Sequence, residues 1–536
     1  MKVTIRTLIT IGLALAAVLV VHAAQAAQNN RKLSGTMPAF GDVSNIAPLI
    51  SPDRQYVVYV ADQATDGANE LWSAPMTGSG APVRVSGALP TTSTISSFAI
   101  TPDSQRVVYI APQDTPGMVE LYSAPITGGL PIKLNATLSA NSDVAGFEIS
   151  PDGTHVVYQA TQDTFSVMNL FSAPIEGGTA ITLNSTLIAG GTVSLFRISS
   201  DSSRVVYSAD QDTDDVTELY SVPLTGGLPT KLNGTLVAGG DVSCCDFTIS
   251  ADNARVVYSA DQDTDNVVEL YSVPLTGGST TKLNGTLVAG GSMLGFHVSP
   301  DSTRVVYWAD QETDGVNELY SVPIAGGAAT KLNGALVNNG DVNTFAISSD
   351  SARVVYSADQ DTDNVTELYS MPIAGGSTTK LNGALITGGD VFLWAISPDS
   401  NRVVYFANQD VVTTTELYAA PITGGAAVKL NGPIVAGGSL IGFQISPDGS
   451  GVVYRATQDV ATILELYGVA ITGGSVSKIS GALTTGRTTT VSTMNNQSVI
   501  YVADQDTNDI FELYASDVAF GAGGGGFRVY LPLVMR

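Results

Sequence analysis

The chain has 536 residues, and its 49 acidic and 24 basic side chains give a formal net charge of −25. This charge disfavours nucleic acids and anionic membrane surfaces as partners, because both are bound through clustered Lys and Arg. Hydrophobic residues make up 44% of the chain and Gly is abundant at 55 residues, which favours a buried core of short strands joined by tight turns.

The first 26 residues have the pattern of a signal peptide. Lys2 and Arg6 precede an apolar stretch at 8–21, and Ala24-Gln25-Ala26 is a small-x-small cleavage site. The apolar stretch is short for a membrane span. We therefore predict cleavage before Ala27 and export to the periplasm, the cell surface or the medium, with an uncleaved anchor as the alternative. No later segment has the length and apolarity of a membrane span.

An internal repeat organises residues 27–516. Val-Val-Tyr, or Val-Ile-Tyr in the last copy, recurs every 47 to 51 residues, ending at Tyr59, Tyr109, Tyr158, Tyr207, Tyr258, Tyr307, Tyr356, Tyr405, Tyr454 and Tyr501. Each unit has four short apolar runs, which in one copy cover 345–347, 354–356, 368–371 and 380–381. Turn-forming Gly, Pro, Asp and Asn separate these runs. The pattern predicts an all-β fold, a β-propeller of about ten four-stranded blades.

The two ends of the repeat region complement each other. Residues 32–43, KLSGTMPAFGDV, match the fourth-strand phrase KLNGTLVAGGDV at 231–242, whereas the last unit at 488–516 has no matching fourth strand. We expect the N-terminal strand to complete the last blade, with 31–34 pairing with 512–515, because closure leaves no exposed sheet edge. This favours one ring over two smaller propellers.

Residues 445–479 hold a full copy of the repeat, from Ile445-Ser446-Pro447-Asp448 through Glu465-Leu466-Tyr467 to Lys478-Ile479. This phrase resembles the TolB-like, WD-type propeller repeat of bacterial exported proteins, and the resemblance covers about 32–516. It implies the propeller fold but no single function, since the family includes binding scaffolds, components of protein complexes and the propeller halves of peptidases. More copies, a longer linker between blades and an acidic second hairpin distinguish this chain.

Alternating aspartates form the hairpin between the second and third strands of several units. Three units share this spacing, with Asp210, Asp212 and Asp214, with Asp261, Asp263 and Asp265, and with Asp359, Asp361 and Asp363. Alternating carboxylates in a tight loop suit Ca²⁺, which takes six to eight oxygen ligands. The alternative is a set of solvated turns in which Asp side chains accept backbone N–H groups.

Propeller geometry places these hairpins on one face, together with the linkers between blades. The sequence then predicts that the Arg before Val-Val-Tyr and the Lys before Leu-Asn lie on the opposite face. Arg204, Arg255 and Arg353 are expected to be separated from Asp212, Asp263 and Asp361 in this way.

One position in the first strand varies although its neighbours do not. It holds Glu148, Arg197, Thr248, His297 and Gln444 in different units. These side chains are expected either to line the channel and bind a polar ligand, or to point into the gaps between blades and pair with one another.

The sequence offers little support for catalysis. It has no G-x-S-x-G elbow, no Cys/His zinc spacing and no phosphate loop, so we predict no catalytic residue and a binding or scaffolding module. The alternative is a carbohydrate-active lyase or glycosidase that uses acidic pairs on the same fold. The expected partner is a protein or polysaccharide at the cell surface.

Two further segments depart from the repeat. Cys244-Cys245 falls in a two-residue insertion, where a vicinal disulfide would stiffen a turn, or where two small residues simply occupy a loop. A glycine-rich linker at 517–526 leads to the tail FRVYLPLVMR at 527–536. The tail resembles short sorting tails of bacterial exported proteins, and the alternative is an extra strand or a disordered end.

Overall fold

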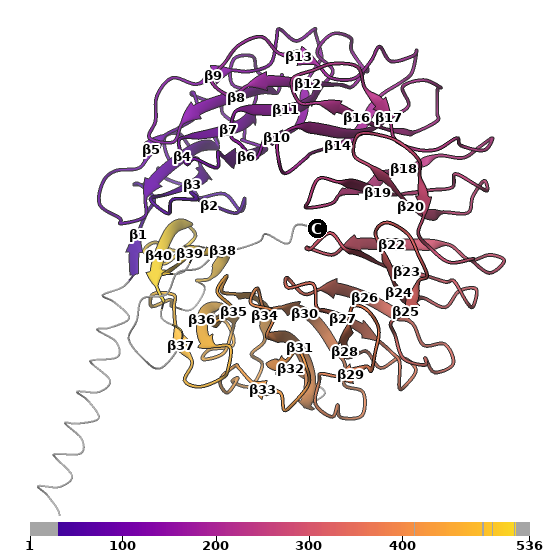
Figure 1. The fold of residues 1–536 in the computed structure, drawn as a ribbon. Helices are drawn as coiled ribbons and strands as arrows, with labels where there is room; N and C mark the ends of the chain where they lie inside the picture. The colour runs from indigo at the N-terminus through magenta and orange to yellow at the C-terminus, as the bar shows by residue number, and fades with distance from the viewer. Residues whose placement is uncertain (1–29, 412, 485–486, 496, 519, 521–536) are drawn as a thin grey trace, which may run out of the picture. The chain divides into compact units, whose positions relative to one another are not determined.

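The computed structural model describes residues 30–411, 413–484, 487–495, 497–518 and 520. Within these residues the regular secondary structure consists of forty β-strands and no helix. The strands form ten four-stranded antiparallel sheets (Figure 1). The predicted all-β propeller of ten blades is therefore confirmed. The predicted signal peptide and the tail at 527–536 lie outside the described residues, as does most of the glycine-rich linker. Within the described residues, no helix has the length and apolarity that a membrane crossing requires.

The chain divides into two compact units. Unit 1 comprises the chain up to Val83 together with the chain from Lys429 onward, and unit 2 comprises Arg84–Val428. We number the blades 1 to 10 in chain order, and the unit boundaries fall within the fourth strands of blades 1 and 8.

Unit 1 contains blades 1, 9 and 10. Their strands are β2 (Leu49–Ile50), β3 (Tyr56–Ala61), β4 (Glu70–Pro75) and β5 (Val83–Arg84) in blade 1; β34 (Leu440–Ile445), β35 (Gly451–Ala456), β36 (Glu465–Ala470) and β37 (Ser477–Lys478) in blade 9; and β38 (Thr489–Met494), β39 (Ser498–Ala503), β40 (Glu512–Asp517) and β1 (Asn30–Lys32) in blade 10.

Unit 2 contains blades 2 to 8, which follow one another in chain order (Figure 1). Blades 2 to 4 are β6 (Ser97–Ile100), β7 (Arg106–Ala111), β8 (Glu120–Pro125), β9 (Ile132–Lys133); β10 (Val144–Ile149), β11 (His155–Ala160), β12 (Asn169–Pro174), β13 (Ile181–Thr182); and β14 (Val193–Ile198), β15 (Arg204–Ala209), β16 (Glu218–Pro223), β17 (Thr230–Lys231). Blades 5 and 6 are β18 (Val242–Ile249), β19 (Arg255–Ala260), β20 (Glu269–Pro274), β21 (Thr281–Lys282); and β22 (Met293–Val298), β23 (Arg304–Ala309), β24 (Glu318–Pro323), β25 (Thr330–Lys331). Blades 7 and 8 are β26 (Val342–Ile347), β27 (Arg353–Ala358), β28 (Glu367–Pro372), β29 (Thr379–Lys380); and β30 (Val391–Ile396), β31 (Arg402–Val411), β32 (Thr414–Pro421), β33 (Val428–Lys429).

The Val-Val-Tyr motif is apolar throughout because both faces of the second strand are buried. In β15, Val205 and Tyr207 pack against blade 3, whereas Val206 packs into the core formed with blade 5. Side chains alternate between the two faces of a strand, so a strand that is covered on both faces needs an uninterrupted apolar run. Tyr207 also stacks on Tyr220 of β16, with ring centroids 5.3 Å apart.

Adjacent blades are joined by a buried glutamine from the acidic hairpin. In blade 5 the Gln262 side-chain oxygen accepts hydrogen bonds from Tyr258 Oη, at 2.9 Å, and from the backbone N–H of Gly234 in the preceding linker, at 2.8 Å. The same position holds Ala136 and Ser185 in blades 2 and 3, and their backbone N–H groups donate to Gln162 and Gln211 in the same way. The hairpin is thus a structural joint as well as an acidic loop.

The N-terminal strand completes blade 10, as predicted. In β1, Asn30, Arg31 and Lys32 lie opposite Ser516, Ala515 and Tyr514 of β40, and Leu33 N donates to Leu513 O at 2.7 Å. Arg31 Nη1 also lies 2.7 Å from Asp517 Oδ1. The predicted pairing of 31–34 with 512–515 is confirmed.

The two-residue insertion with Cys244-Cys245 belongs to strand β18. Val242 pairs with Ala260 and Phe247 pairs with Tyr258, so the extra residues form a bulge between these two pairs. A bulge takes up inserted residues while the ladder continues on both sides. The two cysteines therefore stand in a strand and not in a loop, and the predicted disulfide concerns side chains outside those described.

Candidate functional site

The three aspartates of each acidic hairpin contact different groups. In blade 5, Asp261 accepts the N–H of Asp241 at 2.5 Å and that of Asn266 at 2.9 Å, whereas Asp263 pairs with Lys282 at 3.5 Å. The Asp265 carboxylate packs on Gly239, where a Cβ would lie 2.9 Å from Asp265 Oδ1. The first and second positions are used in the same way by Asp210 and Asp212 in blade 4, and by Asp359 and Asp361 in blade 7.

The aspartates of one hairpin contact different groups and do not converge on a common point, which weakens the calcium prediction. No group of three or more His, Cys, Asp or Glu side chains is arranged to hold a metal ion in the described parts of the chain. A single Ca²⁺ needs its oxygen ligands to converge, whereas Asp261 and Asp263 are oriented by a backbone amide and a lysine. Calcium binding at Asp214, Asp265, Asp363 and their neighbours remains a prediction.

The expected position of the lysines is wrong. The sequence predicts Lys231 of β17 on the face of the propeller away from the acidic hairpins. Its Nζ instead lies beside the hairpin, 2.8 Å from Asp212 Oδ2 and 2.6 Å from Glu218 Oε1. The fourth strand is only two residues long and Lys231 is paired with Tyr220, so the long side chain reaches the hairpin end of the blade. The same Lys–Glu pair recurs at Lys133–Glu120, Lys282–Glu269, Lys331–Glu318, Lys380–Glu367, Lys478–Glu465 and, across the closing strand, Lys32–Glu512.

These contacts change the titration of the hairpin. The hydrogen bond from Lys231 is the largest cause that lowers the pKa of Asp212. Burial opposes the charge on Lys231, but its hydrogen bonds to Asp212 and Glu218 outweigh burial and raise the pKa of the lysine. The acidic hairpin of blade 4 is therefore paired with a lysine of the same blade.

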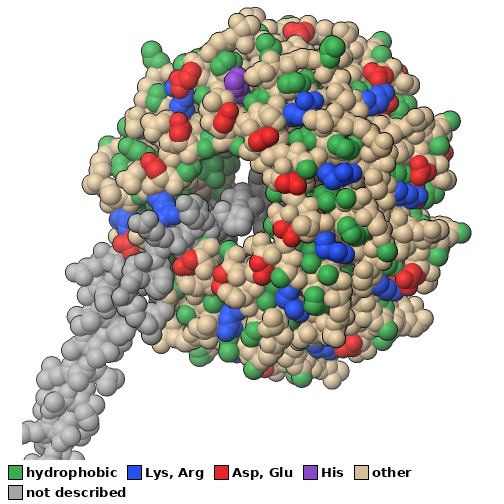
Figure 2. Space-filling view, viewed as in Figure 1, with side chains coloured by type: hydrophobic (Ala, Val, Ile, Leu, Met, Phe, Trp, Pro, Cys, Tyr) green, Lys and Arg blue, Asp and Glu red, His purple; other side chains and the backbone are tan. Residues whose placement is uncertain are grey.

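Figure 2 shows Lys and Arg side chains recurring over the blades of unit 2, with Asp or Glu beside several of them.

The arginines lie where the sequence places them. Arg204 begins β15, whereas Asp212 follows the end of that strand, so the two occupy opposite ends of the blade. Arg204 Nε donates to Ser221 Oγ at 2.7 Å. Arg255 and Arg353 make the same contact with Ser272 and Ser370. Arginine and aspartate are thus separated as predicted.

Three of the five variable first-strand residues, Glu148, His297 and Gln444, contact the following blade. Glu148 of β10 accepts the N–H of Ile198 at 3.0 Å and lies 3.9 Å from Arg197 Nη1. Gln444 of β34 donates to Ser492 O at 3.0 Å. His297 of β22 packs edge-on against Phe345, with centroids 4.9 Å apart, and burial lowers its pKa. Thr248 is exposed on β18. The structure thus brings Glu148 and Arg197 together, while His297 and Gln444 meet other residues.

The residue directly after Val-Val-Tyr in the second strand also varies between blades, and in several blades it contacts the next blade. This position holds Gln159, Trp308 and Arg455. Gln159 Nε2 donates to Val193 O of the next blade at 3.0 Å, and Arg455 Nη2 donates to Thr489 O at 3.0 Å. Trp308 packs edge-on against Phe345. The sequence carries a signal for this position, since the residue after the tyrosine varies in an otherwise regular phrase.

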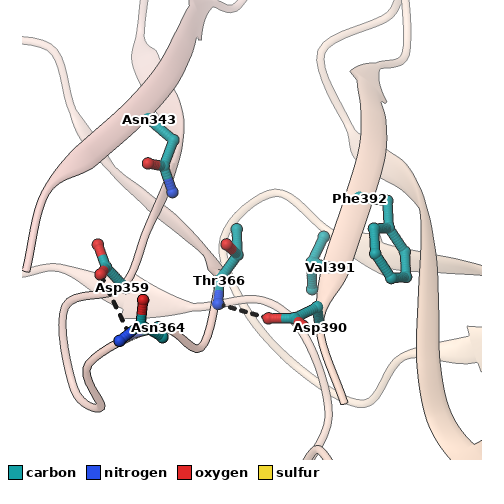
Figure 3. A pocket seen from close by; sticks show the side chains of 7 residues that line it. All are labelled: Asn343, Asp359, Asn364, Thr366, Asp390, Val391 and Phe392. Carbon is teal, nitrogen blue, oxygen red and sulfur yellow. Dashed lines mark hydrogen bonds between the residues drawn. The ribbon is translucent and has the colours of Figure 1, made fainter. Parts of the chain in front are cut away.

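A pocket of about 340 Å³ lies between blades 7 and 8 at the acidic-hairpin end (Figure 3). Asn343 of β26 and Phe392 of β30 contribute side chains, and Phe392 is 49% exposed. The remaining lining residues are Asp359, Asn364, Thr366, Asp390 and Val391. None of these residues was singled out from the sequence as a channel candidate, although Asp359 was among the calcium candidates.

The two carboxylates of this pocket hold the surrounding loops. Asp359 accepts the N–H of Asp341 at 2.6 Å and that of Asn364 at 3.3 Å, and Asp390 accepts the N–H of Thr366 at 2.8 Å. Backbone hydrogen bonds fix the orientation of both carboxylates. The arrangement therefore offers fixed acceptors, amide groups and one aromatic ring to a ligand.

No protein-family model and no curated protein matches the sequence significantly. Among solved structures, "putative TolB" from Agrobacterium tumefaciens is similar at 21% identity over 44% of this chain and 79% of its own, with a TM-score of 0.28. An oligogalacturonate lyase from Vibrio parahaemolyticus is similar at 13% identity over 73% and 98%, with a TM-score of 0.36. A prolyl endopeptidase is similar at 14% identity over 68% and 54%, with a TM-score of 0.38. The structural neighbours thus include a TolB-like protein and enzymes, and at these identities and TM-scores they assign no activity to this chain.

Proposed function

We propose that this propeller is an exported, non-catalytic binding module, and that the pocket between blades 7 and 8 binds an uncharged, hydroxyl-rich ligand such as a segment of neutral polysaccharide. The observation that carries this proposal is that an exposed aromatic residue, Phe392, lines the same pocket as Asn343, Asp359 and Asp390, which carry amide and carboxylate groups.

The chemistry of the lining supports this class of ligand. An aromatic face packs against C–H groups, while carboxylate and amide oxygens accept hydrogen bonds from hydroxyls. The net charge of −25 repels polyanions at long range. Asp359 and Asp390 are held by backbone N–H groups, which suits them to fixed recognition.

The test is a binding titration of the full chain against a panel of neutral polysaccharides, with Phe392→Ala as the diagnostic variant. Leu294 of β22 is a matched control, because it occupies the same position in blade 6 and is 50% exposed. We expect Phe392→Ala to weaken binding by roughly 10-fold and Leu294→Ala to leave it unchanged. Equal effects of both substitutions would place the ligand elsewhere.

The same samples test catalysis. Incubation of each bound polysaccharide with the protein is followed by an assay for new reducing ends and for unsaturated products. A binding module leaves the polymer intact. Turnover that is lost in Asp390→Asn would instead support the carbohydrate-active enzyme considered from the sequence.

A further inference from the structure

One contact recurs at the arginine end of five of the ten blades. The first residue of the second strand is Arg, and its Nε donates to a serine of the third strand, as Arg304 does to Ser321 at 2.7 Å. Arg106 and Ser123 make this contact at 2.7 Å in blade 2. The Arg304 guanidinium also donates from Nη2 to Ser321 O at 3.4 Å, so it lies against the third strand.

Blade 9 lacks both side chains of this contact. Gly451 begins β35 at the position of the arginine, and Gly468 of β36 stands at the position of the serine. The register is unchanged, because Gly451 pairs with Ala470 as Arg304 pairs with Pro323. Two missing side chains at adjacent positions leave a hollow at this end of the blade.

The ring of Phe520 fills this hollow. A Cβ atom at Gly451 would lie 2.0 Å from Phe520 Cγ, and one at Gly468 would lie 3.0 Å from Phe520 Cε1. Phe520 is only 9% exposed and belongs to a cluster with Val453 and Leu466 of blade 9. A side chain at Gly451 would therefore clash with Phe520, whereas a Cβ at Gly468 would crowd both Phe520 and Ile479, whose Cδ1 would lie 2.8 Å away.

The repeat explains how Phe520 reaches the preceding blade. After β40, Val518 N donates to Gln497 O at 2.9 Å, as Leu224 N donates to Ser203 O in blade 4. Two residues further on, Phe520 stands at the position that Gly226 holds in blade 4. Gly226 lies so close to the preceding blade that a Cβ there would be 3.0 Å from Ile181 Cδ1. A phenylalanine at this position therefore directs its ring into the preceding blade.

We propose that the Gly451–Gly468 hollow is a docking pocket for the chain's own Phe520, which the Val518–Gln497 hydrogen bond brings within reach. Three departures from the repeat agree with each other: an arginine and a serine are replaced by glycine in blade 9, and a glycine is replaced by phenylalanine at the end of blade 10. The docked Phe520 ties blade 10 to blade 9 and fixes the point in unit 1 from which the chain continues beyond residue 520.

The first experiment is hydrogen exchange on the full chain, with Gly451→Ala compared with Gly442→Ala. A Cβ at Gly442 meets nothing within 4 Å, so this variant introduces the same methyl group in the same blade without contact. We expect Gly451→Ala to speed exchange in peptides covering 514–520 by roughly 10-fold or more, while Gly442→Ala leaves it unchanged. Unchanged exchange in Gly451→Ala overturns the proposal.

The second experiment is a rescue that separates loss of docking from misfolding. Phe520→Ala empties the hollow and is expected to lower the melting temperature. The pair Gly451→Arg and Gly468→Ser restores the contact of those five blades, so its addition to Phe520→Ala should recover part of this loss. The same pair in the presence of Phe520 should expose the chain at Phe520 to protease. If Gly451→Arg with Gly468→Ser lowers the melting temperature equally in the wild type and in Phe520→Ala, the proposal is overturned. Side chains that occupy the same space must have non-additive effects on stability.

Size-exclusion chromatography with light scattering tests whether the occupant belongs to the same chain. Docking within one chain predicts the same oligomeric state for the wild type and Phe520→Ala at all concentrations. A dimer that dissociates in Phe520→Ala would show that the hollow binds a second copy, and would overturn docking in cis.

Discussion

The side-chain oxygen of Gln262 lies 2.8 Å from the backbone nitrogen of Gly234 and thereby joins blade 5 to the linker that precedes it. Gln262 is buried. Corresponding glutamines accept the same backbone N–H at Gln211, Gln311, Gln360 and Gln458. A conspicuously acidic loop is therefore joined to the preceding linker through an uncharged polar side chain.

We expect Gln262→Ala to destabilise the protein by about 1–3 kcal/mol, because it leaves the half-buried Gly234 N–H without its acceptor and removes a buried side chain. Gln105 is the control, since it lies exposed in a turn and donates only to Asp103 O at 3.3 Å. Gln105→Ala should change stability by no more than about 0.5 kcal/mol. The shift of the urea midpoint measures both, and equal shifts would contradict a joint between blades.

The lysines of the fourth strands should reduce charge repulsion within the hairpins. We expect Lys231→Met, Lys282→Met and Lys380→Met together to lower the melting temperature, and added NaCl to recover part of the loss because salt screens exposed carboxylates. Each single change should also lower stability, since it leaves a buried glutamate, Glu218, Glu269 or Glu367, without its cation. An undiminished melting temperature in the triple variant at low salt would contradict this role.

Calcium can be compared with these lysines directly. At fixed ionic strength, we expect millimolar Ca²⁺ to stabilise the wild type no more than NaCl does, because Asp212 and its counterparts already pair with lysine. The triple lysine variant should respond more strongly, since its carboxylates lack a cation. Extra stabilisation of the wild type that disappears in Asp212→Asn, Asp263→Asn, Asp361→Asn combined would instead support the calcium prediction.

The turns between first and second strands should make stability depend on acidic pH. Ser199 Oγ and the N–H of Ser203 donate to Asp201 at 2.7 and 3.0 Å, and these hydrogen bonds lower the pKa of the aspartate. The unfolded chain then binds the proton more tightly, at a pKa of about 3.9. The stabilisation is present above that pKa and is lost as pH falls through the lower folded value.

Asp201→Asn keeps the acceptor oxygen and removes the charge, so it should flatten the pH dependence between about pH 5 and 2. Combining it with Asp252→Asn and Asp350→Asn should enlarge the effect, because the pKa values of these aspartates are also lowered. Asp201→Ala should lower stability at every pH. Melting curves across this range measure all three, and a pH dependence equal to that of the wild type would contradict the assignment.

Removal of the closing strand should cost more than any single side chain. Deletion of residues 27–34 removes the ladder with β40 and exposes the backbone edge of that strand. We expect aggregation or oligomers by light scattering, together with a large fall in the melting temperature. Arg31→Ala removes the ion pair with Asp517 but keeps the ladder, so it should remain monodisperse. Deletion without either effect would contradict closure by β1.

The sequence alone determined the blades and their closure. Val-Val-Tyr, the glycine and Ser-Pro-Asp turns and the complementary ends of the chain are local patterns, and each reports strand burial or turn geometry within a few residues. The separation of Arg204 from Asp212 also followed, because the two residues lie at opposite ends of one short strand.

Only the tertiary structure decided what the side chains of neighbouring strands and blades contact. Lys231 reaches Asp212 because the fourth strand is two residues long, and Glu148 meets Ile198 because adjacent blades lie against each other. Phe520 fills a hollow left by two glycines some fifty and seventy residues earlier, which no local pattern reveals. These contacts depend on how far side chains extend across the sheet and between blades, and strand periodicity does not encode those distances.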